Sequence, residues 1–109
     1  MQPLHLLAYF FGGGFAINAL PHLAAGTMGR RFPSPFASPP GEGLSPAVVN
    51  VLWGFANLLL AWLLVCRIGS FDIRQGGDVA PFALGVLALG LFAARHFGAQ
   101  NGGTGPSAA

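Results

Sequence analysis

A chain of 109 residues holds one domain, and this one is 53% apolar and only 7% charged, whereas a soluble domain is about 25% charged. So few charges cannot cover a surface that faces water, which excludes an ordinary soluble protein and indicates one that lies in lipid. The net charge of +2, carried by dispersed arginines, excludes a basic nucleic-acid-binding stripe, and the single cysteine excludes an internal disulfide.

The first apolar segment covers residues 4–25 and is long enough, as a helix, to cross a hydrocarbon core of about 30 Å. Its glycines are tolerated because a backbone in lipid must bond to itself. Ala8, Gly12 and Ala16 are spaced four apart, a small-residue stripe that favours close helix approach. Pro21 removes a backbone donor and predicts a kink in the last turn.

Residues 26–45 form a proline-rich loop. Four prolines between Phe32 and Pro40 exclude a helix and a central strand. Phe32 and Phe36 are unusual in a mere linker, because disordered segments contain few aromatic residues. We therefore expect the loop to fold back onto the membrane surface or the helix ends. An exposed linker and an extended ligand for a partner protein are the alternatives.

The second apolar segment, residues 46–66, contains no charge and ends at Arg67. Ser45 followed by Pro46 predicts its start, with a capping hydroxyl before a proline at the first helical position. A polar loop of residues 67–78 follows, in which Gly76 and Gly77 are expected to form a turn.

The third apolar segment covers residues 79–97, and Asp78 is expected to cap it. Its charge-free part is shorter than the usual span of about 20 residues, so Arg95 should extend its charge to the headgroups. Residues 98–109 are rich in glycine, serine and alanine and predict a disordered tail. The fold class is an all-α membrane protein, with a single three-helix transmembrane domain in residues 1–97.

The arginines indicate an orientation. Three spans place the first loop and the C-terminus on the same side, which then carries three arginines, against two for the other side: Arg30, Arg31 and Arg95 against Arg67 and Arg74. The positive-inside rule therefore favours an outside N-terminus and an inside C-terminus.

Polar residues inside the spans are costly unless they are paired, so their positions are informative. Asn18 and His22 share one face of the first helix, and Asn50 and Asn57 share one face of the second, together with Gly54. Antiparallel packing of neighbouring spans should gather these groups near the first loop. The candidate binding residues are Asn18, His22, Asn50, Asn57, Arg95 and His96, with loop contacts from Arg30, Arg31, Phe32 and Phe36.

This polar cluster has two interpretations. Asparagine and histidine often bond across helices and specify their register, which is a purely structural role. Alternatively, the cluster forms a pocket beneath the loop for a lipid headgroup, a small solute or a partner's helix.

Other chemistry has less support. His22 and His96 could together hold a metal or haem, but the sequence lacks HxxxH, CxxC and HExxH patterns. No carboxylate lies within a span, where proton-coupled transporters usually place one. We therefore expect no catalytic residue, no metal, no cofactor and no enzymatic activity.

Three stretches carry a resemblance: Asn18-Ala-Leu-Pro-His22, the Phe-Pro-Ser-Pro-Phe-Ala-Ser-Pro-Pro run of residues 32–40, and Val49-Asn-Val-Leu-Trp-Gly-Phe-Ala-Asn57. Together they resemble a set of small multi-pass bacterial membrane proteins without an assigned activity. The resemblance covers about half of the chain and implies a bacterial inner membrane and a shared fold.

The leading hypothesis from the sequence is an accessory, assembly or self-associating membrane subunit without enzymatic activity, whose small-residue stripe and Phe-Pro loop would contact a membrane-protein partner or a second copy. The alternative is an oligomeric transporter, or a protein that binds a small solute or lipid through the polar cluster. Three spans rarely enclose a pathway alone, so transport would need an oligomer.

Overall fold

The computed structural model describes residues 2–105. Its three helices are each long and apolar enough to cross a membrane, which confirms the predicted all-α, multi-pass membrane fold. In chain order the elements are α1 (Pro3–Thr27), β1 (Phe32–Pro33), β2 (Leu44–Ser45), α2 (Ala47–Trp62), a π-helical continuation of α2 (Leu63–Ile68) and α3 (Gly76–Asn101).

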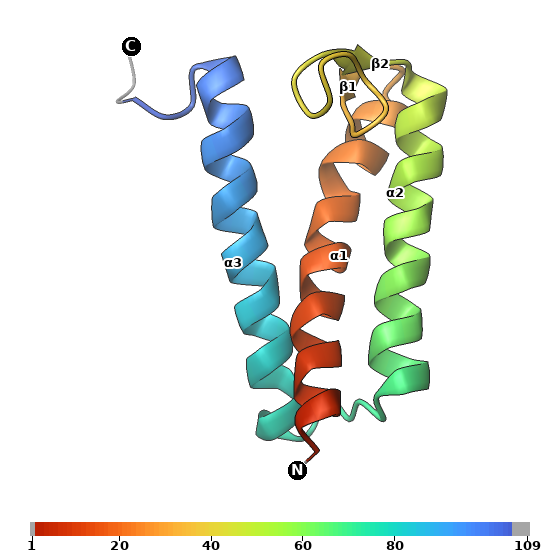
Figure 1. The fold of residues 1–109 in the computed structure, drawn as a ribbon, viewed down its shortest axis with the longest axis vertical. Coiled ribbons are helices and arrows are strands. Elements are labelled where there is room, and N and C mark those ends of the chain that lie inside the picture. The colour runs from red at the N-terminus through yellow and green to blue at the C-terminus, as the bar shows by residue number, and fades with distance from the viewer. Residues whose placement is uncertain (1, 106–109) are drawn as a thin grey trace.

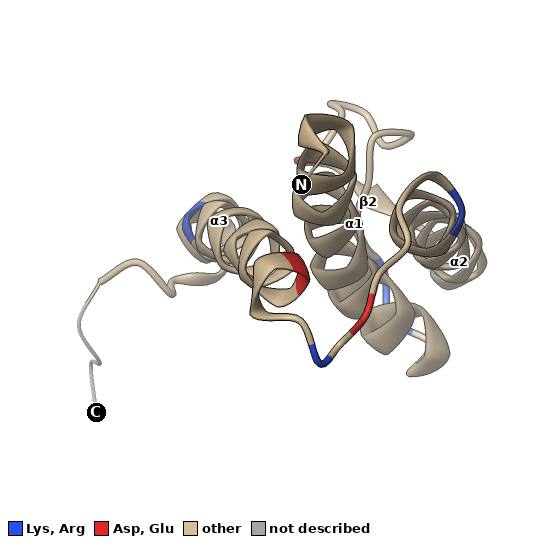
Figure 2. Ribbon diagram, turned by 90° about the horizontal axis from the view of Figure 1, so that it is seen from below, with Lys and Arg blue, Asp and Glu red and all other residues tan. Residues whose placement is uncertain are grey.

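Helix α1 lies between the other two, as Figure 1 shows from the side and Figure 2 along the helices. Both α2 and α3 pack along α1, whereas they make little contact with each other in the part of the chain that the structure describes. Figure 2 also shows how few charged positions the ribbon carries. The outward faces are apolar, as lipid requires, with Leu52 and Leu87 each more than half exposed.

Glycines set the close contacts on both sides of α1. A Cβ at Gly13 would overlap the carbonyl oxygen of Phe82 in α3, and a Cβ at Gly85 would overlap that of Phe10 in α1. On the other side, a Cβ at Gly54 in α2 would lie 2.6 Å from Cγ of Leu23. Close backbone approach of this kind is how helices gain packing energy in lipid.

The proline-rich loop folds back onto the helix ends, as the sequence predicted. Strands β1 and β2 pair antiparallel and bring the two ends of the loop together. The Phe32 ring then lies between the rings of His22 in α1 and Phe97 in α3, at centroid distances of 5.4 and 4.8 Å. Phe36, although 66% exposed, packs edge-on against Trp53 in α2 at 5.3 Å.

The predicted helix ends differ from the observed ones in detail. Helix α1 runs through Pro21, as predicted, and ends at Thr27 rather than at residue 25. Ser45 does not cap α2, because its hydroxyl bonds to that of Ser34 at 2.6 Å and Pro46 occupies the N-cap position.

Helix α3 is longer than predicted at both ends. Gly76 and Gly77 belong to its first turn, and Gln75 takes the N-cap position. The Asp78 carboxylate lies inside that turn and accepts a bond from the Asp72 amide at 3.0 Å. The predicted tail is helical as far as Asn101, and residues 106–109 lie outside the described residues.

Candidate binding cavity beneath the proline-rich loop

A cavity of about 320 Å³ lies at the loop end of the helices. Helix α3 diverges from α1 towards this end, above the close contact of Gly13 and Gly85 (Figure 1). Five residues of the loop, between Pro33 and Gly41, form one wall. The helices contribute Asn18 and His22 from α1, Trp53 from α2, and Phe92, His96 and Phe97 from α3.

Asn57 anchors the deeper end of the polar cluster. It is fully buried in α2, and its Nδ2 donates to the carbonyl of Trp53 at 2.7 Å. Because that bond identifies the amide nitrogen, Oδ1 is the acceptor, and it receives a bond from Nδ2 of Asn18 at 3.0 Å. The pair joins α1 to α2 and supports the structural interpretation for Asn57.

Asn50, also fully buried, holds the loop. Its Nδ2 donates to three backbone carbonyls at the two ends of the loop, those of Phe32, Ser45 and Pro46, at 3.0, 3.1 and 3.2 Å. The remaining amide atom, Oδ1, lies 2.7 Å from Nδ1 of His22. Since an amide oxygen only accepts, Nδ1 of His22 must carry the hydrogen.

This bond determines the chemistry of His22. A neutral imidazole with its hydrogen on Nδ1 presents a lone pair at Nε2, which is an acceptor and a potential ligand atom. Among residues 2–105 nothing donates to Nε2, and no enclosed side-chain nitrogen or oxygen lacks a partner. The His22 side chain is only 2% exposed, so Nε2 must open onto the cavity that His22 lines.

The α3 wall is tied to the loop. Nε2 of His96 lies 2.7 Å from the carbonyl oxygen of Gly41, and Nε2 of Gln100 donates to the same oxygen at 3.2 Å. Gly41 has a φ of 74°, which favours glycine at this position. Sequence reasoning missed Gln100, because it was placed in a disordered tail, although it is four residues after His96 and shares its face.

The structure separates the predicted site residues into four groups. Asn18, His22 and His96 line the cavity, while Asn57 and Asn50 lie behind it and bond to Asn18 and His22 respectively. Both loop phenylalanines pack against the helices, Phe32 against the His22 ring and Phe36 against Trp53. The three arginines do not join the cavity: Arg30, Arg31 and Arg95 are all exposed and outside its lining.

Sequence reasoning also missed Ser34, whose buried hydroxyl bonds to Ser45 and accepts from the Phe36 amide at 3.1 Å. Its position before a proline resembled an ordinary loop serine. Within residues 2–105, no three histidine, cysteine or acidic side chains gather as metal ligands would.

None of the protein-family models, curated proteins or solved structures compared with this chain matches it.

Proposed function

We propose that this chain is a non-enzymatic binding protein of the bacterial inner membrane, and that it holds a small polar group, from a lipid headgroup or a solute, in the cavity beneath the loop. The observation that carries the proposal is the Nε2 atom of His22. This atom opens onto the cavity as an acceptor to which nothing within residues 2–105 donates. A ligand that donates a hydrogen to Nε2 would form a bond there that the chain itself does not supply.

Binding explains the polar cluster better than passage across the membrane. A pathway would need polar groups that remain accessible along the span, but the deepest one, Asn57, is fully buried and uses both its oxygen and its nitrogen within the chain. The groups that line the cavity are Asn18, beside Asn57, and His22, one turn nearer the loop, and the cavity continues from them only towards the loop. The cluster therefore resembles a site that is open at one side.

Native mass spectrometry of the full chain, extracted gently from its own membrane, tests this proposal. We expect a bound species that is retained by the wild type and lost from His22→Phe, which keeps an aromatic ring but removes Nε2. The control is His5→Phe, at the opposite end of α1, which should keep the ligand. Equal ligand occupancy in both variants, with helicity unchanged by circular dichroism, would refute the proposal.

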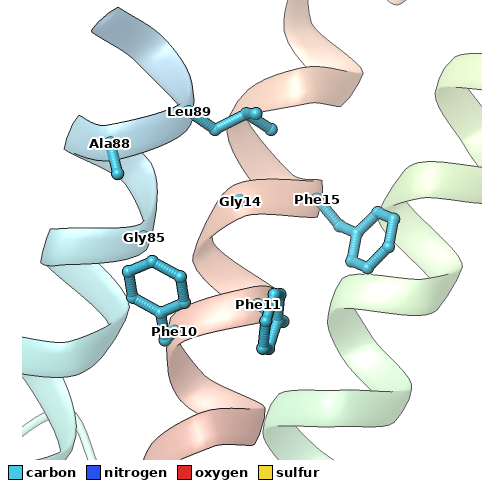
Figure 3. A pocket seen from close by; sticks show the side chains of 7 residues that line it. All are labelled: Phe10, Phe11, Gly14, Phe15, Gly85, Ala88 and Leu89. Carbon is cyan, nitrogen blue, oxygen red and sulfur yellow. The ribbon is translucent and has the colours of Figure 1, made fainter. Parts of the chain in front are cut away.

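A self-associating subunit is the second candidate, although the small-residue stripe does not support it. Ala8 and Gly12 are buried within the chain, and a Cβ on Gly12 would overlap the Val65 side chain. The supporting observation is an apolar groove of about 360 Å³ between α1 and α3. Figure 3 shows the phenyl rings that line it and Leu89 reaching from α3 towards Gly14.

The partner in this second candidate is another copy of the chain. An exposed ridge on α3, formed by Leu84, Leu87 and Leu91, has the spacing that fits such a groove. Native mass spectrometry should then show a homo-oligomer that Phe11→Ala weakens, because Phe11 lines the groove and is 54% exposed. A single-chain mass at all concentrations, or a complex with a different protein, would exclude self-association.

We further propose that the loop and the cavity face the cytoplasm, because Arg30, Arg31 and Arg95 lie on that side against Arg67 and Arg74 on the other. A fluorescent protein that folds only in the cytoplasm should be fluorescent when fused to the C-terminus. A periplasm-dependent phosphatase at the same position should be inactive. The opposite pair of results would invert the orientation.

A further inference from the structure

We infer that the group bound in the cavity is a primary ammonium, held by Nε2 of His22 and Oδ1 of Asn18. This inference rests on the proposed binding function and adds the chemical class of the ligand. It follows from the hydrogen-bond roles that the surrounding network imposes on these two side chains.

Asn18 presents an acceptor for the same reason as His22. Asn57 accepts through Oδ1, so the Asn18 atom that faces it at 3.0 Å is Nδ2. The Asn18 oxygen is then directed elsewhere, and among residues 2–105 nothing donates to it. Asn18 lines the cavity and is partly exposed there.

The two acceptors are placed for a single donor group. Asn18 and His22 are four residues apart in α1, so they lie one above the other, with Cβ atoms about 5–6 Å apart. A nitrogen with several hydrogens can donate to both at once, as an ammonium does. A ligand that only accepts, such as a quinone or a phosphate, would face two lone pairs instead.

The rest of the lining favours a cation over an anion. The lining contains no arginine or lysine to pair with an anion and no aspartate or glutamate to pair with a cation, so its neutral acceptors and its aromatic rings decide between the two. Three aromatic side chains, Trp53, Phe92 and Phe97, belong to the lining, and aromatic rings attract ammonium groups. Ser34 supplies the loop hydroxyl in the lining, but that hydroxyl already bonds to the Ser45 hydroxyl and accepts from the Phe36 amide.

The volume indicates a headgroup rather than a bare ion. A cavity of about 320 Å³ lies at the small end of the roughly 300–1,000 Å³ that ligand pockets occupy. An aminoethyl group fits this space. It could be supplied by the headgroup of an ethanolamine phospholipid or by free ethanolamine. A choline headgroup has the same charge but no N–H, so it satisfies neither acceptor.

Tryptophan fluorescence provides the test, because Trp53 lines the cavity and the other tryptophan, Trp62, is exposed. The Trp62→Phe variant of the full chain leaves Trp53 as the single reporter. It would be titrated in detergent with short-chain phosphatidylethanolamine, short-chain phosphatidylcholine and ethanolamine. We expect saturable binding of the ethanolamine lipid, at least tenfold tighter than the choline lipid.

The outcomes separate the ligand class from the function. If both the ethanolamine lipid and free ethanolamine bind, the inference is supported and the ammonium group alone is sufficient for binding. If only the lipid binds, the inference is supported and the natural ligand is the lipid. Equal affinity for the choline lipid would overturn the ammonium assignment but leave the binding function intact. No saturable binding by any probe, with no ligand in native mass spectra, would overturn both.

Variants add a second readout. Asn18→Leu and His22→Phe should each weaken the ethanolamine lipid at least tenfold, and His5→Phe should leave the titration unchanged. If a variant fails to fold, the comparison of ethanolamine and choline lipids on the unaltered cavity still decides the question.

Discussion

The Nδ1 atom of His22 donates to Oδ1 of Asn50 across 2.7 Å and thereby joins α1 to α2. The same Asn50 side chain donates through Nδ2 to backbone carbonyls at both ends of the proline-rich loop. One buried amide therefore sets the tautomer of His22 and also the position of the loop above it. The Asn50 side chain therefore positions the loop that forms one wall of the cavity and also leaves Nε2 of His22 as an acceptor facing it.

The first prediction concerns this amide. In Asn50→Leu the loop carbonyls lose their donor and His22 loses its partner, so the loop should loosen. The expected loss of stability is about 1–3 kcal/mol, the cost of unpaired buried polar groups. Hydrogen exchange should accelerate in residues 28–46, and Tm in detergent should fall.

The matched control for this prediction is Asn101→Leu, which removes an exposed asparagine at the end of α3. It should leave both measurements unchanged. Unaltered exchange of the loop in Asn50→Leu would show that the strand pair and the phenylalanine contacts hold the loop without this amide.

The three spans could be predicted because lipid requires long uncharged helices, which the sequence displays directly. The shared face of α2 was also predictable. Asn50, Gly54 and Asn57 repeat at helical spacing, and all three are buried against α1. Periodicity within one helix is a local property, so no knowledge of the partner helix is needed.

The pairing of the polar groups was not predictable. Asn18 bonds to Asn57 and His22 to Asn50 across 39 and 28 residues, and the tautomer of His22 follows only from those partners. The predicted N-caps of α2 and α3 were wrong for a related reason. Ser45 and Asp78 are typical capping residues, but their side chains bond to Ser34 and to the Asp72 amide instead.

The second prediction concerns the crossing of α1 and α3. In Gly85→Ala the new Cβ would overlap the Phe10 carbonyl, so the backbones must separate. We expect a loss of about 1–3 kcal/mol, typical of overpacking, measured as a lower Tm in detergent. The control is Gly90→Ala, whose Cβ would meet Cγ1 of Ile17 at an ordinary 3.8 Å. Equal Tm values for the two variants would contradict the close packing at Gly85.

The third prediction concerns the other end of the molecule. The buried Tyr9 hydroxyl accepts a bond from the Ser70 amide at 3.0 Å, and its ring packs against Phe71 at 5.4 Å. Tyr9→Phe keeps the ring contact and removes the bond, at a cost of about 0.5–1.5 kcal/mol. The Ser70 amide should exchange faster, while residues 28–46 at the opposite end serve as an internal control. Unchanged protection of Ser70 would show that the hydroxyl has no role there.

The fourth prediction concerns the attachment of the loop to α3. His96 and Gln100 both donate to the Gly41 oxygen, so either one can hold the loop when the other is lost. We therefore expect His96→Phe and Gln100→Ala to have small separate effects, and the double variant to exceed their sum, as coupled neighbours do.

Spin labels at Ala37 in the loop and Ala99 in α3, in a Cys66→Ser background, would measure this attachment. The distance distribution should broaden clearly only in the double variant. A second label pair, at Ala37 and Val48 in α2, is the control and should stay narrow, because Asn50 holds that side of the loop independently. Broadening of both pairs would mean that the loop moves as one unit, and broadening of neither would mean that Gly41 does not tether it to α3.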